Sequence, residues 1–167
     1  MLFFLIIFAI TSQNNDVFGQ DDQSNNNDNF RTIPTNISGI TCDRVEHLVY
    51  HNHTKLVIKF QNETHNIPAG IGIIPNDCIF WLHTHDDSGI IHIESPVKTA
   101  FSLDKFLKVW NVFDNSSFVE NISKNDIAAN VSMISENGSK TKSDDYKNII
   151  LENNAIITLE FANKSKN

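Results

Sequence analysis

Basic residues are scarce in this sequence. Lys and Arg total 13 against 20 Asp and Glu, which gives a formal net charge of −7 at pH 7. Nucleic-acid-binding domains carry clustered positive charge, so this balance argues against a nucleic-acid partner. An acidic surface instead favours solubility and can attract cations.

Long hydrophobic runs are also scarce, and the clearest one lies at the N-terminus. Leu2–Ile10 is shorter than the roughly 17–25 residues of a membrane-spanning helix but fits a secretory signal core of about 7–15. With Val17 and Gly19 at the −3 and −1 positions, we expect residues 1–19 to be a cleaved signal peptide. The protein would then be secreted or held at the cell surface. The alternative is an uncleaved N-terminal segment, which would be the membrane contact of the protein.

Cysteine is nearly absent, with two residues, Cys42 and Cys78. An even number in an exported chain predicts one disulfide bond. Closing a loop of this length stabilises a fold by about 3–4 kcal/mol on loop-entropy grounds. The alternative is that both thiolates bind a metal ion.

Several signatures of enzymes are missing. The sequence contains no phosphate-binding loop, no dinucleotide fingerprint and no nucleophile–base–acid arrangement. It also has no methionine-rich run, which argues against a thioether site for Cu(I). These absences leave the most recognisable catalytic classes without support.

The patterns that are present predict a mainly β (α+β) fold: a β-sandwich or small barrel-like domain with one short helix. Residues 20–32 form an acidic, Asn-rich linker, 33–161 a single β-rich domain and 162–167 a polar tail. The expected strands are 56–60, 65–67, 78–85, 90–94, 131–134, 148–151 and 155–161. Asn137-Gly138 signals a turn, and 102–110 has the apolar spacing of a helix that Ser102 can cap.

Asparagine is abundant, and eight Asn-x-Ser/Thr triplets follow. They begin at Asn36, Asn52, Asn62, Asn115, Asn121, Asn130, Asn137 and Asn163. Such sites predict a glycoprotein, although an Asn- and Ser-rich chain also produces them by chance. Asn52 lies between two candidate metal ligands and is a poor place for a sugar.

Histidines form the strongest chemical signal. His51 and His53 form one His-x-His pair and His83 and His85 another, and residues at i and i+2 of a strand share a face. Folding 78–94 as a hairpin about the 86–89 turn places His83 opposite His92. The same hairpin pairs His85 with Ile90 and Trp81 with Glu94, and side chains that are directly opposed have Cβ atoms about 4.5–5.5 Å apart.

This register predicts a metal site of His83, His85, His92 and Glu94. The alternative is a structural network in which Asp86, Asp87 and Glu94 hydrogen-bond the imidazoles.

The first pair is harder to place, because His51 and His53 share a face with lysines. A bulge near Thr54 would turn the two histidines to the face opposite the lysines. Without such a bulge, the pair lies on an outer surface. If two sheets packed with both His faces together, one site of four or five ligands would result, and otherwise there would be two sites. Glu46, His47 and His65 are isolated and are read as structural or exposed.

Imidazole ligands suit copper and zinc, and the affinity order favours Cu(II). The function expected is therefore an exported, His-rich transition-metal-binding protein, with copper favoured and zinc second, acting as a carrier, scavenger or sensor. One alternative is a small metalloenzyme, an oxidase or hydrolase, using the same cluster. Another is a glycosylated surface or adhesion domain that never binds metal.

A longer motif resembles an uncharacterised family of exported prokaryotic proteins with a WLHTHD-x-x-G-x-IHIESP signature. The resemblance covers about Ile40 to Trp110, including Cys42, His51-x-His53, the segment 68–73, Trp81–Asp86, Gly89, Ile91–Pro96 and Phe101–Leu103. It implies export and a shared site at these positions and names no reaction. A cupin-like barrel is an alternative at the level of fold only, because no Glu follows His53 or His85 at the cupin spacing.

Overall fold

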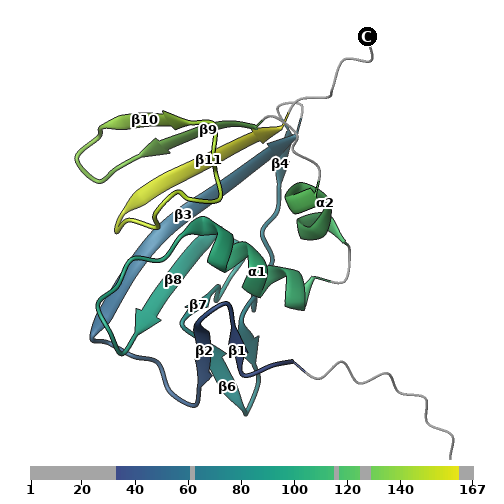
Figure 1. The fold of residues 1–167 in the computed structure, drawn as a ribbon, viewed down its shortest axis with the longest axis vertical. Helices are drawn as coiled ribbons and strands as arrows, with labels where there is room; N and C mark the ends of the chain where they lie inside the picture. The colour runs from purple at the N-terminus through teal and green to yellow at the C-terminus, as the bar shows by residue number, and fades with distance from the viewer. Residues whose placement is uncertain (1–32, 61–62, 115–116, 125–128, 162–167) are drawn as a thin grey trace, which may run out of the picture. The chain divides into compact units, whose positions relative to one another are not determined.

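A computed structural model describes residues 33–60, 63–114, 117–124 and 129–161. The predicted signal peptide (1–19), linker (20–32) and tail (162–167) lie outside the described residues. The described part contains two β-sheets and two helices, which confirms the mainly β, α+β class (Figure 1). Within this part, no helix is long and apolar enough to cross a membrane.

The larger sheet is organised around one long strand, β3. Its order is β10 (Lys140–Ser143), β9 (Ala129–Ile134), β11 (Ala155–Phe161), β3 (Tyr50–Phe60), β8 (Ile90–Ser95) and β7 (Leu82–His83), and β4 (Glu63–His65) also pairs with β3. One edge of β3 pairs antiparallel with β8, and the other pairs parallel with β11. The long β3 thus joins the two halves of the sheet, as Figure 1 shows.

The smaller sheet contains the disulfide. Its order is β1 (Asn36–Ile37), β2 (Ile40–Asp43), β6 (Cys78–Phe80) and β5 (Ile73–Ile74). Cys42 and Cys78 are bonded across β2 and β6, with their Cα atoms 5.4 Å apart. The predicted disulfide is confirmed, and the alternative of two thiolate ligands is excluded.

The strand predicted over 78–85 is divided between the two sheets. Its first part is β6 in the small sheet, and after Trp81 the chain continues as β7 in the large sheet. Within the hairpin, His83 pairs with His92 as predicted, and the backbone N–H of Glu94 donates to the carbonyl of Trp81 at 2.8 Å. The expected pairing of His85 with Ile90 is not formed, because His85 lies in the bend that leads into the turn.

The core lies on one face of the large sheet. Leu56, Ile58, Ile91 and Ile93 are almost completely buried, and alternate residues of β3 point to the opposite, solvent-facing side. Burying each such side chain stabilises the fold by about 1.5–3 kcal/mol. The alternation on β3 is unbroken, so the bulge considered near Thr54 is absent and the histidines of β3 lie on the open face.

The helices complete this core. Helix α1 (Leu103–Phe113) buries one stripe of apolar side chains, including Phe106 and Trp110. It extends three residues beyond the predicted end, and α2 (Phe118–Lys124), which follows it, was not predicted. Both helices lie on the same side of the large sheet in Figure 1.

The start of α1 explains one wrong prediction. Ser102 is the N-cap but its side chain makes no capping hydrogen bond. Instead, the N–H groups of Leu103 and Asp104 donate to the carbonyls of Ile149 and Lys147. The segment 148–151 therefore packs against the start of the helix and does not form the predicted strand. The Asn137-Gly138 turn leads instead into β10, which pairs with β9.

Candidate metal centre

Three adjacent strands, β7, β8 and β3, bring the candidate ligands together. His92 on the middle strand pairs with His83 of β7 on one side and with His53 of β3 on the other. His51 pairs with Glu94 two residues along the same strands. Because side chains alternate between faces, all five residues project from the open face of the sheet.

Two glycines make close backbone contacts with the strands of the site. Gly89, with φ +79°, lies against β3, where a Cβ would come within 2.5 Å of the Leu56 carbonyl oxygen. Gly72, with φ +75°, lies beside β7, where a Cβ would come within 2.6 Å of the Leu82 oxygen and 3.1 Å of the His83 Cβ. These close approaches require glycine.

His83 is oriented as a metal ligand would be. The residue is completely buried, and its Nδ1–H donates to the Phe80 carbonyl at 2.8 Å. This hydrogen bond leaves the lone pair on Nε2, which lies at hydrogen-bond distance, 3.1 Å, from Nε2 of His85. Two nitrogens on one tetrahedral ion, at bonds of about 2.0–2.1 Å, lie about 3.3 Å apart. The two rings are therefore already near the spacing that an ion would impose.

Glu94 completes the first group of ligands. Its side chain is only 4% exposed, with Oε1 3.2 Å from Nε2 of His51 and 3.5 Å from Nδ1 of His92. Among the described residues, the buried side-chain atoms that lack a hydrogen-bond partner are Oε2 of Glu94 and Nδ1 of His92. Buried polar atoms are nearly always paired, so two orphans in one cluster mark a place where a cation would supply the missing partner.

The local environment keeps His83 and His92 neutral. Burial lowers the pKa of His83 to about 4, against the smaller opposing effect of its bond to the Phe80 carbonyl. Burial, followed by repulsion from His85, His53 and His51, lowers the pKa of His92 to about 4. Burial raises the pKa of Glu94, and the nearby Glu46 carboxylate adds to this rise. Neutral imidazole is the form that binds metal, and His83 and His92 have this form at neutral pH.

Two overlapping sets of ligand atoms result. His83, His85, His92 and Glu94 form one set, and His51, His53 and His92 form the other; within each set the ligand atoms lie within 4.8 Å of one another. The sequence allowed two sheets with facing histidines, or separate sites. The structure excludes facing sheets and places the two pairs on one sheet, on either side of β8, because β3 and β7 both pair with β8.

Glu46 is a neighbour of the site that sequence reasoning missed. Its Oε1 lies 3.5 Å from Nε2 of His85, although the two residues belong to different segments. The same loop contains His47, which pairs with Asp43 at 2.7 Å, and Asp43 also accepts a hydrogen bond from the Trp81 indole. Only the tertiary packing of this loop brings Glu46 to the site, so no pattern in the sequence could have identified it.

The remaining polar candidates have structural contacts. Asp86 accepts the backbone N–H of Ser88 within the turn, and Asp87 is exposed. His65 stacks on Phe118 with ring centroids 3.6 Å apart, and burial lowers its pKa. His47 and His65 therefore make structural contacts, as expected. Of the three carboxylates considered for a hydrogen-bond network with the imidazoles, Glu94 is the one that contacts them.

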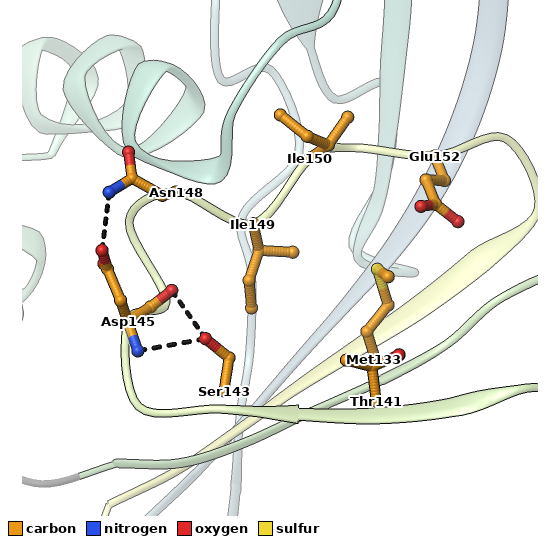
Figure 2. A pocket seen from close by; sticks show the side chains of 8 residues that line it. All are labelled: Met133, Thr141, Ser143, Asp145, Asn148, Ile149, Ile150 and Glu152. Atoms are coloured by element: carbon orange, nitrogen blue, oxygen red, sulfur yellow. Dashed lines mark hydrogen bonds between the residues drawn. The ribbon is translucent and has the colours of Figure 1, made fainter.

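A pocket elsewhere on the domain lacks comparable chemistry. It has a volume of about 300 Å³ and is lined by residues of β9, β10 and the segment 143–152 (Figure 2). Asp145 accepts a hydrogen bond from the Asn148 amide at 2.6 Å, and its own N–H donates to Ser143 Oγ at 3.1 Å. None of the six candidate ligands lines this pocket.

The chain was also compared with known proteins. A scan against protein-family models and searches of curated proteins and of solved structures found no match. The candidate function therefore rests on the geometry of this chain.

Proposed function

We propose that this protein binds a transition-metal ion at His83, His85, His92 and Glu94. The observation that carries the proposal is the pair of buried atoms that make no hydrogen bond among the described residues, Oε2 of Glu94 and Nδ1 of His92, within a cluster of candidate ligands. Leaving such atoms unpaired costs about 1–3 kcal/mol each, and a bound cation would remove that cost.

The ligand chemistry favours Cu(II), with Zn(II) second. Three imidazoles and one carboxylate suit either ion, and the general affinity order places copper above zinc. The disulfide between Cys42 and Cys78 leaves no thiolate for a soft-metal site and supports an oxidising location outside the cytoplasm. We propose that the protein is exported, as the N-terminal sequence predicts.

The geometry favours binding over catalysis. His85 is 42% exposed on an open sheet face, while His83 is fully buried. Such a half-open site lets an ion enter and leave, which fits a carrier, scavenger or sensor. A catalytic site would also need an enclosed substrate pocket, and the pocket in Figure 2 is built from other residues.

The test is direct metal analysis of untagged protein produced with export and disulfide formation intact. We expect bound copper or zinc, and tight competition for Cu(II) against a chromophoric chelator. His83→Ala and His92→Ala should each weaken binding by more than about tenfold, because even changes outside the ligand shell cost 10–100-fold.

His65→Ala is the matched control, because this half-buried imidazole lies outside the cluster, against Phe118. Equal losses in all three variants, or no metal binding by the wild-type protein, would contradict the proposal.

A further inference from the structure

The histidines of β3 are not among the four proposed ligands of the first ion, yet they lie against two of those ligands, Glu94 and His92. The His53 and His92 ring centroids are 4.5 Å apart with the rings at 88°, and those of His51 and His53 are 4.7 Å apart. On the other side of His92, the His85 ring is also 4.5 Å away, at 85°. His92 therefore has a nearly perpendicular imidazole on each side.

One ion cannot use all of these side chains. The cluster holds five imidazoles and one carboxylate, whereas zinc sites are almost always four-coordinate. Ligands on a single ion, at bonds of about 2.1 Å, lie no more than about 4.2 Å apart. The two sets of ligand atoms have only His92 in common, so the cluster is divided into two groups that share one ring. The groups also touch where Oε1 of Glu94 lies 3.2 Å from Nε2 of His51.

We propose that the face holds two adjacent ions, the second bound by His51, His53 and His92, with the His92 ring shared between them. This inference rests on the proposed function, because the first ion must bind for His92 to be shared. One ring nitrogen of His92 binds each ion, so the remaining N–H proton of the ring leaves to the solvent and no electrons are transferred. The resulting imidazolate and the Glu94 carboxylate offset part of the positive charge of the two ions.

The two sites differ in their access to solvent. The first has four protein ligands, two of them buried, whereas the second has three, of which His51 is 38% exposed. Three protein ligands leave a position open for water or a small anion. The second ion is therefore the one that binds more weakly and exchanges more readily.

The probe is Cu(II), added stepwise to untagged full-length protein and followed by metal analysis and electron paramagnetic resonance. We expect two ions per chain. The resonance intensity should rise to one equivalent and then fall as the second ion binds, because an imidazolate couples two Cu(II) spins antiferromagnetically.

The variants His53→Ala and His85→Ala form a matched pair, since the two rings flank His92 at the same distance. His53→Ala should retain one ion with an uncoupled signal, while His85→Ala should weaken the first ion. His92→Ala should weaken both by more than about tenfold. His65→Ala is the control for unrelated loss of an imidazole and should still bind two coupled ions.

The possible outcomes separate the two proposals. One ion in the wild-type protein overturns the second site and leaves the proposed function standing. Two ions whose signals simply add overturn the sharing of His92. No bound ion overturns both. The measurement on the wild-type protein decides these cases even if a variant fails to fold.

Discussion

The polar groups on the histidine face, the sheet surface that carries His51, His53, His83, His92 and Glu94, differ from those of the pocket in Figure 2. The difference is whether they have hydrogen-bond partners. In the pocket, Asp145 is exposed and its oxygens accept hydrogen bonds from Asn148 and from the Lys147 backbone. On the histidine face, Glu94 is buried and one of its oxygens has no partner among the described residues. The comparison teaches that buried polar atoms without partners distinguish the proposed metal centre more clearly than the volume of a cavity does.

The largest effect that would sharpen this comparison is stabilisation by metal. At a free ion concentration of a thousand times the Kd, a ligand that binds only the native state adds about 4 kcal/mol to the free energy of unfolding. We expect a gain of this size with Cu(II) in urea unfolding of the wild-type protein. Asp145→Asn, in the pocket, should retain the metal-dependent gain in the free energy of unfolding, and His83→Ala should lose it. Equal gains in both variants would contradict the difference between the two regions.

The pH dependence of the apo-protein comes next in size. The pKa of His83 is about 4 in the folded protein and about 6.5 when unfolded, so between these values the unfolded chain binds more protons. Stability should therefore fall as the pH is lowered from 6.5 towards 4, with a slope from His83 of up to about 1.4 kcal/mol per pH unit.

Glu94 acts in the opposite direction, because its raised pKa lets the folded state take up a proton first. Urea unfolding of the apo-protein at several pH values, in the wild type and in His83→Gln, measures the contribution of His83. The variant should show a shallower slope over this window, and identical slopes would contradict the neutral, buried state of His83.

Glu94→Gln should stabilise the apo-protein by about 1 kcal/mol while weakening metal binding. The reason is that the isosteric amide removes a buried carboxylate whose Oε2 lacks a partner. Thermal or urea unfolding in a chelator measures the first effect, and chelator competition measures the second. A variant that is less stable without metal would show that Glu94 contributes to the fold and not to a site.

The smallest effect belongs to the pocket. Asp145→Ala should lower the free energy of unfolding by about 0.5–1 kcal/mol, because it removes exposed hydrogen bonds to Asn148 and Lys147. The change should leave metal stoichiometry intact. A loss of bound metal in this variant would mean that the two regions are coupled.

The local features of the site could be predicted from the sequence. The 86–89 turn and the period of two along the strands were enough to place His83 opposite His92, and to place Ile91 and Ile93 on the buried face. The cysteine count similarly predicted the disulfide. The strand predicted at 148–151 was wrong, because the carbonyls of Lys147 and Ile149 accept hydrogen bonds from the start of α1, a contact with no local signature.

The sequence by itself determined the hairpin, the ligand chemistry and the alternation that separates the buried face from the open one, because these follow from short-range geometry. Only the tertiary structure decided that β3 lies beside β8, that the chain changes sheets after Trp81, and that Glu46 approaches His85. Pairing between distant segments depends on which arrangement buries the whole core best, and no short stretch of sequence contains that information. The sharing of His92 between two groups of ligands is a consequence of that pairing.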